Sequence, residues 1–250
     1  MSSDVPQKDF PASSHVALMD KVYRRQRHIY DFTRKYYLLG RDRLIRELDA
    51  QADEKIVEIG CGTARNLIAI SKAYPGVQLF GLDASHEMLR SAEESVNHAG
   101  LKEKIALAHG LAENMTPALF GVNEKFDRAI FSYSLSMIPD WRRALKTAAE
   151  NVRPGGTIHI VDFGDLEGLW APIARAIRAW LRLFHVAPRD ELLKSLEGAR
   201  NTTLSFYIFP GRYAFVITAH PEAFSEPDTL KSFARMVPVC ARAHIKPRWK

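Results

Sequence analysis

The stretch VEIGCGTARNL, residues 57–67, decides the fold expected for this chain of 250 residues. It completes a run of strand-forming residues, KIVEIG (55–60), turns on two glycines and opens a helical pattern through ARNLIAISKAY (64–74). Gly60 and Gly62 permit a tight turn and let a ligand approach the backbone closely, because neither carries a Cβ. A strand, a glycine turn and a helix in this order are typical of the ligand-binding edge of an open α/β sheet.

The segments downstream repeat the alternation of strand and helix. A further strand is predicted at VQLFGLD (77–83), followed by a helix over 85–100. More strands are predicted at KIALAHG (104–110), FDRAIFSY (126–133) and, after a Pro-Gly-Gly turn at 154–156, GTIHIVDF (156–163). TTLSFYIFPGRYAFVITAH (202–220) predicts two antiparallel strands around a Pro-Gly turn. The sequence therefore predicts a doubly wound, Rossmann-like α/β sheet that ends in an antiparallel hairpin.

The composition, 46% hydrophobic and 26% charged, suits one sizeable core. A helical pattern runs from Leu18 to about Leu48, with a break expected near Gly40. We expect four parts: a loose N-terminal arm (1–15), an N-terminal helical lid (16–50), the α/β domain (51–220) and a basic C-terminal tail (221–250).

The charge and the cysteine content indicate which partners and which cellular compartment to expect. The net charge of +6 fits nucleic acid, an anionic membrane or no special partner. The two cysteines, Cys61 and Cys240, favour a reduced, cytoplasmic setting over a disulfide framework. No signal segment and no run of about 18 apolar residues is visible, so we expect a soluble or peripheral protein. The histidines show no ligand spacing, and no metal site is predicted.

The glycine turn departs from the pattern that binds dinucleotides. Arg65 stands where a G-x-G-x-x-G motif would place its third glycine, which disfavours a pyrophosphate site. Glu58 beside the turn would repel a pyrophosphate but suits a cationic ligand. Asp83 ends the next strand, where its carboxylate can accept both hydroxyls of a ribose. A nucleoside with a positive group in place of phosphates describes S-adenosylmethionine. The alternatives are a plain strand–helix turn and an Asp83 that only caps the helix at Ser85.

Four motifs in order now carry a resemblance: VEIGCGTARNL, GLDASHEML, FDRAIFSYSLSMIPDW and RPGGTIHIVDF. Together, over roughly residues 54–165, they resemble class I S-adenosylmethionine-dependent methyltransferases. The resemblance implies that Gly60 and Gly62 pass the methionine moiety and that Asp83 binds the ribose. It further implies a cofactor site completed by Glu58, Cys61, Ala84, Met88, Leu111, Ala112 and Ser132. Ala84 and Met88 would flank the adenine, and Leu111 stands where the family often has an aspartate.

A second, more specific resemblance lies partly outside the cofactor motifs. The segments MDKVYRRQRHIYDFTRKYYLLGRDRLI (19–45), SYSLSMIPDW (132–141), VDFGD (161–165) and FHVAPRDEL (184–192) are similar to the bacterial methyltransferase family of betaine-lipid synthesis. That family methylates the amino group of diacylglycerylhomoserine three times, giving diacylglyceryl-N,N,N-trimethylhomoserine. The resemblance implies this lipid as the substrate, an anionic membrane surface as a partner and contact with the enzyme that makes the homoserine lipid.

The substrate class suggests roles for residues of this chain. Tyrosine faces stabilise a quaternary ammonium product through cation–π attraction, and Tyr30, Tyr37 and Tyr133 are the candidates. Arg34 or Arg41 would hold the carboxylate as a bidentate pair. We expect Asp162, at the end of the fifth strand, to bind the ammonium or accept its proton. Ser136 and Met137, in the segment after the fourth strand, are expected to contact the substrate. Ordinary helix packing is the alternative for each tyrosine.

The segment LWAPIARAIRAWLRLF (169–184) predicts an amphipathic helix with an apolar stripe, arginines beside it and no acidic residue. This pattern is typical of a helix that lies in a membrane interface, and packing of the stripe on the sheet is the alternative.

Three other functions compete with lipid methylation: methylation of nucleic acid, methylation of a small amine or hydroxyl compound, and cofactor binding without catalysis. No base-pocket signature follows the fourth strand, and no nucleic-acid partner is expected.

Overall fold

The computed structural model describes residues 38–182 and 203–224, together with residues 186, 188, 191, 193 and 194. The expectations for the N-terminal arm, for Tyr30, Arg34 and Tyr37, and for residues 225–250 lie outside the described residues.

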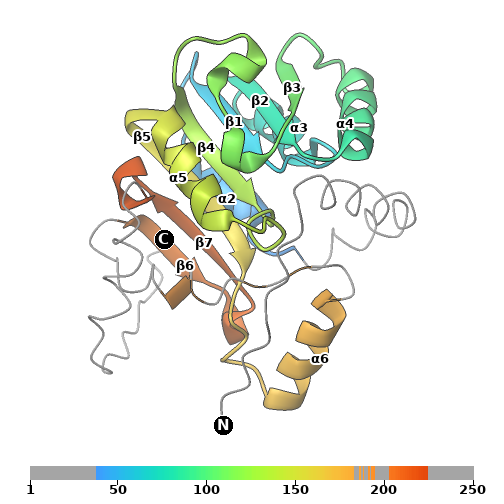
Figure 1. Cartoon of the computed structure of the whole chain (residues 1–250), viewed down its shortest axis with the longest axis vertical. Helices are drawn as coiled ribbons and strands as arrows, with labels where there is room; N and C mark the ends of the chain where they lie inside the picture. The colour runs from blue at the N-terminus through green and yellow to red at the C-terminus, as the bar shows by residue number, and fades with distance from the viewer. Residues whose placement is uncertain are drawn as a thin grey trace, which may run out of the picture.

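A single seven-stranded sheet organises the described chain, in the order β3-β2-β1-β4-β5-β7-β6 (Figure 1). Its strands are β1 (Lys55–Ile59), β2 (Gln78–Asp83), β3 (Ile105–His109), β4 (Phe126–Ser132), β5 (Val152–Phe163), β6 (Thr203–Ile208) and β7 (Ala214–Ala219). The first five are parallel to one another, and β7 runs antiparallel to both β5 and β6. The predicted fold class, a doubly wound Rossmann-like sheet with an antiparallel C-terminal hairpin, is confirmed.

The strand order reverses between β1 and β4, because the chain builds outward from β1 to β3 and then returns to the other side of β1. In sheets of this kind a ligand binds at the carboxyl ends of the strands that flank this switch point. The glycine turn after β1, Asp83 at the end of β2 and Ser132 at the end of β4 all lie there.

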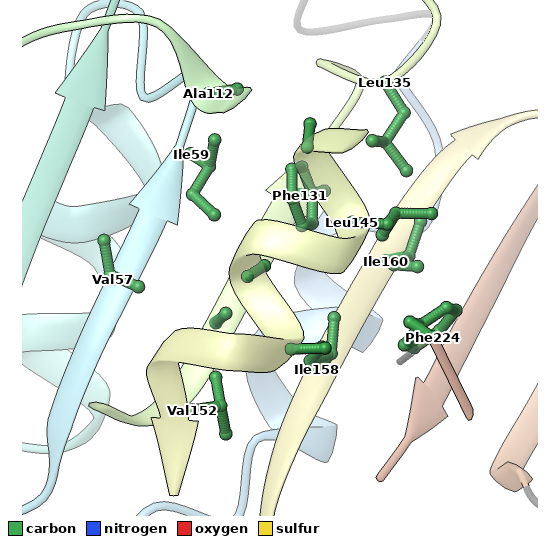
Figure 2. Close-up of a cluster of buried hydrophobic side chains, with 14 of the residues drawn as sticks. Val57, Ile59, Ala112, Phe131, Leu135, Leu145, Val152, Ile158, Ile160 and Phe224 are labelled. Atoms are coloured by element: carbon green, nitrogen blue, oxygen red, sulfur yellow. The ribbon is translucent and has the colours of Figure 1, made fainter. Parts of the chain in front are cut away.

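Helices cover both faces of the sheet. They are α2 (Arg41–Glu47), α3 (Arg65–Ala73), α4 (His86–His98), α5 (Trp141–Asn151) and α6 (Ala171–Arg182), with short 3-10 turns η1 (Ala112–Asn114), η2 (Pro117–Phe120), η3 (Pro210–Arg212) and η4 (Pro221–Phe224). One buried cluster lies under α5, where Leu145 packs with Phe131 and Ile160, as Figure 2 shows. The other buries apolar residues of α2, α3 and α4 on the opposite face.

Several local features refine the sequence-based picture. The expected break at Gly40 is present: Gly40 has a φ of 89° and precedes α2. The Pro-Gly-Gly turn lies inside β5, because that strand already pairs Val152 with Phe126 before its register shifts. Helix α5 had no specific prediction; its N-cap is Asp140, whose carboxylate accepts a hydrogen bond from the Arg143 amide.

The expected boundary of the C-terminal tail at residue 221 falls too early. Pro221, Ala223 and Phe224 are buried, and Phe224 packs in the cluster under α5. An aromatic side chain of this size stabilises the domain by being removed from water, so the folded unit extends at least to Phe224.

Candidate cofactor and acceptor site

The turn after β1 has the geometry that its glycines predict. Gly60 and Gly62 have φ values of 77° and 55°, in the left-handed region that L residues with a side chain seldom adopt. The amides of Gly60 and Cys61 both donate to the Leu82 carbonyl, at 2.8 and 2.9 Å, which ties the turn to the end of β2. A Cβ on Gly60 would lie 2.5 Å from the Cβ of Ser134. Only glycine therefore lets the turn and the β4–α5 loop meet this closely.

Asp83 faces the same turn. Its two carboxylate oxygens accept hydrogen bonds from the Gly62 amide at 2.8 Å and the Ser85 amide at 2.9 Å. Ser85, and not Asp83, is the N-cap of α4, since the Ser85 hydroxyl accepts from the Met88 amide. The alternative that Asp83 caps this helix is wrong. A carboxylate oxygen can accept more than one hydrogen bond, as a ribose contact would require.

Two cavities meet at Gly60 and Gly62. The larger, of about 320 Å³, is lined by Leu38, Arg41, Glu58, Cys61, Thr63, Arg65, Asn66, Ile68, Ser95 and Ser132 in addition to the two glycines. The smaller, of about 110 Å³, adds Ile59, Leu82, Asp83, Ala84, Ser85, Gly110, Leu111, Ala112, Glu113, Tyr133, Ser134, Met137, Ile138 and Pro139. The walls of both cavities thus share the glycine turn, and we describe the cavities as the larger and smaller halves of one site.

Two carboxylates, those of Glu58 and Asp83, lie beside the turn, and Arg41 and Arg65 also line the larger cavity. Glu58 is buried and accepts a hydrogen bond from the Asn66 amide nitrogen at 2.7 Å, which joins β1 to the first turn of α3. Burial, and next the negative charges of Asp83 and Glu58, raise the pKa of the Cys61 thiol well above its ordinary value. Cys61 is therefore a protonated, inert wall residue, and the charge beside the turn suits a cationic ligand.

The residues of the site fit S-adenosylmethionine. Glu58 and Asn66 present polar groups in the larger half, and Asp83 stands at the junction with the smaller half. The smaller half is walled by apolar side chains such as Leu111, Ala112 and Ile138, which suit an adenine ring. The acidic charge of the turn agrees with a sulfonium nucleoside and disagrees with a pyrophosphate.

Tyr133 joins the site to the start of α2. Its hydroxyl donates to the Leu39 carbonyl at 2.5 Å, and its ring packs edge-on against Phe163 with centroids 4.7 Å apart. Burial, followed by the nearby negative charge of Asp162, raises the pKa of Tyr133 well above its ordinary value. The phenol is therefore neutral, and it holds the segment before Arg41 against the site.

Asp162 acts on the loop after β4. This carboxylate is 1% exposed and accepts hydrogen bonds from the Ser136 amide at 2.9 Å and the Phe163 amide at 2.8 Å. It was expected to face the rim, and neither Asp162 nor Ser136 is among the residues that line the two cavities. In this structure the carboxylate fixes the loop that carries Tyr133 and Met137.

The structure brings most of the predicted cofactor residues together. Glu58, Gly60, Cys61, Gly62, Asp83, Ala84, Leu111, Ala112 and Ser132 line the cavities, as do Arg41, Tyr133 and Met137. Met88 does not: it is buried in α4 and is not among the residues that line either cavity. Their roles remain predictions.

The cavity walls also contain polar residues that sequence reasoning missed, namely Thr63, Asn66, Glu113 and Ser134. Asn66 had a usable signal, because helical side chains lean toward the N-terminus of the helix, and a polar side chain in the first turn after a glycine turn therefore lies next to that turn. Ser134 had none, since its contact with Gly60 joins two loops far apart in the sequence. Among the described residues, the buried hydroxyls of Ser132, Ser134 and Ser136 have no hydrogen-bond partner.

The chain has the class I methyltransferase fold, and the residues of its site fit S-adenosylmethionine as the cofactor. Residues 56–156 match the family model described as a methyltransferase domain. A demethylmenaquinone methyltransferase from Geobacillus sp. (strain WCH70) is 32% identical over 139 residues, which is 55% of this chain and 56% of the relative. The chain thus spans about half the length of the curated relatives it matches.

Solved structures share the fold at low sequence identity. A SAM-dependent methyltransferase from Aquifex aeolicus aligns with a TM-score of 0.53 at 16% identity, covering 84% of this chain and 98% of that one. A chain from the complex between the Haloferax volcanii Trm112 methyltransferase activator and the putative methyltransferase aligns with a TM-score of 0.61 at 12% identity, covering 81% and 97%. These likenesses concern the fold alone.

Proposed function

We propose that this protein is an S-adenosylmethionine-dependent N-methyltransferase that methylates the amino group of diacylglycerylhomoserine three times. The observation that carries the methyltransferase part is the double cavity built on Gly60, Gly62 and Asp83, in a domain that matches methyltransferases in sequence. When bound there, S-adenosylmethionine supplies a methyl group on a positively charged sulfur.

The cofactor half of the proposal assigns roles to the chain's own groups. Asp83 accepts the ribose hydroxyls while the Gly62 and Ser85 amides hold its carboxylate in place. Glu58, oriented by Asn66, places negative charge near the cationic centre. Alignment of donor, methyl carbon and acceptor is the main contribution an enzyme makes to such an in-line transfer, and rigid backbone contacts serve it well.

The acceptor half is supported by the wall that follows β4. Tyr133, Ser134 and Met137 line the smaller cavity next to the end of β4, and we assign the acceptor to them, whereas Leu111, Ala112 and Ile138 are assigned to the adenine. An amine entering this surface loses hydration, which lowers its pKa and favours the neutral, nucleophilic form. The neutral phenol of Tyr133 offers an aromatic surface to the cation that forms. An amine acceptor therefore needs no dedicated base here.

The choice of diacylglycerylhomoserine rests on the resemblance of residues 19–45 and 132–141 to the betaine-lipid family, and on Arg41. Arg41 lines the larger cavity, as Glu58 does. A homoserine headgroup carries a carboxylate beside its amine, and an arginine binds a carboxylate with two parallel hydrogen bonds. The methionine carboxylate of the cofactor has the same chemistry and competes for Arg41.

Methyl transfer to demethylmenaquinone is the second candidate. It is favoured by the name of the relatives that share about a third of their residues with this chain over the cofactor domain. The apolar wall around Met137 would accommodate a quinone ring as well as a lipid amine.

The test uses the full chain with isotopically labelled S-adenosylmethionine and vesicles that contain either lipid. Mass spectrometry should show additions of one, two and three methyl groups to diacylglycerylhomoserine and none to demethylmenaquinone. Transfer to the quinone alone would establish the second candidate and end the first. Asp83→Asn should lose transfer to any acceptor, whereas Asp42→Asn, at an exposed position in α2, should retain it. Arg41→Gln should raise KM for the lipid if Arg41 binds the acceptor, and for the cofactor if it binds methionine.

A further inference from the structure

The outward face of α6 is unusual for a helix on a protein surface. Trp170, directly before the helix, is 72% exposed, and Ile173 is 48% exposed. The other exposed positions of α6 are Ala171, Pro172, Ala176, Ala179 and two arginines, Arg175 and Arg182. Residues 169–184 contain no acidic side chain. This surface combines apolar side chains with positive charge, where an ordinary exposed helix face carries mixed charges.

The predicted apolar stripe is divided between two environments. Leu181 is buried, and Ile177 and Trp180 pack against the same core cluster. The alternative prediction, that the apolar stripe packs on the body of the protein, therefore holds for the second half of α6. Trp170 and Ile173, at its beginning, are exposed. Helix α6 is already anchored to the core by its second half. The exposure of Trp170 and Ile173 therefore does not result from a missing core contact.

Polar contacts fix α6 to the hairpin. Arg212, in the β6–β7 turn, makes a bidentate pair with the buried carboxylate of Asp165, at 2.7 and 2.6 Å. Arg178 of α6 donates to the Asp165 carbonyl. The Gly164 amide donates to the Tyr213 carbonyl at 2.8 Å, where a Cβ on Gly164 would collide with the Arg212 carbonyl. These contacts hold the start of α6 in one orientation.

The location of α6 relates it to the cofactor site. It follows Phe163, the last residue of β5, and β7 begins beside Phe163 with Ala214. The carboxyl end of β5 belongs to the sheet edge that carries the glycine turn and Asp83. Figure 1 shows α6 beyond the end of the sheet at β5. Helix α6 therefore follows the edge of the sheet that carries the glycine turn.

We infer that the face formed by Trp170, Ile173, Arg175 and Arg182 docks this protein onto an anionic lipid surface. Charge complementarity selects the partner: the arginines match lipid phosphates, and the indole and isoleucine side chains enter the boundary between headgroups and acyl chains. Nucleic acid would use the positive charge but not the exposed apolar groups. None of the helices within 38–182 and 203–224 is long and apolar enough to cross a bilayer. The inference goes beyond the proposed function, since it holds for any acceptor that a membrane presents.

The experiment measures sedimentation of the full chain with phosphatidylglycerol-containing vesicles and with neutral phosphatidylcholine vesicles. One basic side chain near an anionic surface contributes roughly fivefold to binding, so Arg175→Glu with Arg182→Glu should weaken it by about 30-fold or more. Trp170→Ala with Ile173→Ser should also weaken it, by removing the apolar insertion. The matched control is Lys102→Glu with Lys125→Glu, which makes the same charge change at exposed positions before β3 and β4, at the amino edge of the sheet.

The control should bind within twofold of the wild type. Equal losses in the control and in the arginine variant would overturn the inference, because binding would then follow net charge alone. Failure of the wild type to sediment with either vesicle would also overturn it, as would capture of RNA but not vesicles by the same face. Binding is measured without turnover, and methyl transfer by the variants is followed separately on detergent-solubilised substrate. A failure of docking and a failure of the proposed reaction are therefore distinguishable.

Discussion

Replacement of Gly60 by alanine separates two costs that the structure assigns to this position. The first is conformational: Gly60 has a φ of 77°, and a residue with a Cβ in the left-handed region costs roughly 1–2 kcal/mol. The second is steric: the new Cβ would stand 2.5 Å from the Cβ of Ser134. That neighbour is attached directly to the backbone and cannot swing aside, so the β4–α5 loop must shift, at roughly 1–3 kcal/mol.

Gly100→Ala is the matched control. Gly100 has a φ of 69°, and nothing lies within 4 Å of the Cβ that alanine would add there. This variant carries the conformational cost alone, reduced in both variants by about 0.4–1 kcal/mol because alanine restricts the unfolded chain. The free energy of unfolding, measured in urea, should therefore fall by about 1–3 kcal/mol more in Gly60→Ala than in Gly100→Ala.

Calorimetric titration with S-adenosylmethionine then tests the role of the close approach in binding. Gly60→Ala should bind the cofactor at least tenfold more weakly, and Gly100→Ala should bind it as the wild type does. Adding Ser134→Gly to Gly60→Ala removes the colliding Cβ and should recover part of the lost stability. If the two single variants lose the same stability and neither loses affinity, the contact between the glycine turn and the β4–α5 loop does not shape the site.

Three further substitutions test other parts of the structure. Asp83→Asn removes the charge-assisted hydrogen bonds to the ribose, worth roughly 1.5–3 kcal/mol, so calorimetry should show S-adenosylmethionine binding weakened about 10- to 100-fold; unchanged affinity would exclude a ribose contact. Tyr133→Phe keeps the ring but loses the hydrogen-bond donor to the Leu39 carbonyl, so the free energy of unfolding in urea should fall by about 0.5–1.5 kcal/mol. The pH profile of methyl transfer should not change. If the variant instead loses the part of that profile at high pH, the phenol acts as a base. Burial lowers the pKa of His159 to about 3, so the unfolded chain binds this proton below pH 6.5 and the folded chain does not. Stability should thus fall on acidification, by about 3 kcal/mol more between pH 7 and pH 4 in the wild type than in His159→Gln; equal slopes in urea titrations would contradict a buried neutral imidazole.

Local sequence signals were sufficient for most elements. The alternation of apolar residues and the glycine and proline turns predicted all seven strands, because periodicity and turn chemistry act within a few residues. The local signals did not predict that Val152–Gly155 belongs to β5, which depends on pairing with Phe126. They also did not predict that Phe224 packs in the core beneath α5. Both depend on partners distant in the chain.

The sequence by itself determined the cofactor half of the site. Gly60 and Gly62 belong to a strand–turn–helix unit whose geometry is local, and their spacing to Asp83 at the end of the next strand predicts the chemistry of the ligand. Only the tertiary structure decided what surrounds that unit. Packing made Asp162 a support of the β4–α5 loop, made Tyr133 a neutral tether of the segment before α2, and left Trp170 exposed while Leu181 was buried. Such outcomes depend on which surfaces meet after folding, and the pattern of residues along one helix or strand does not contain that information.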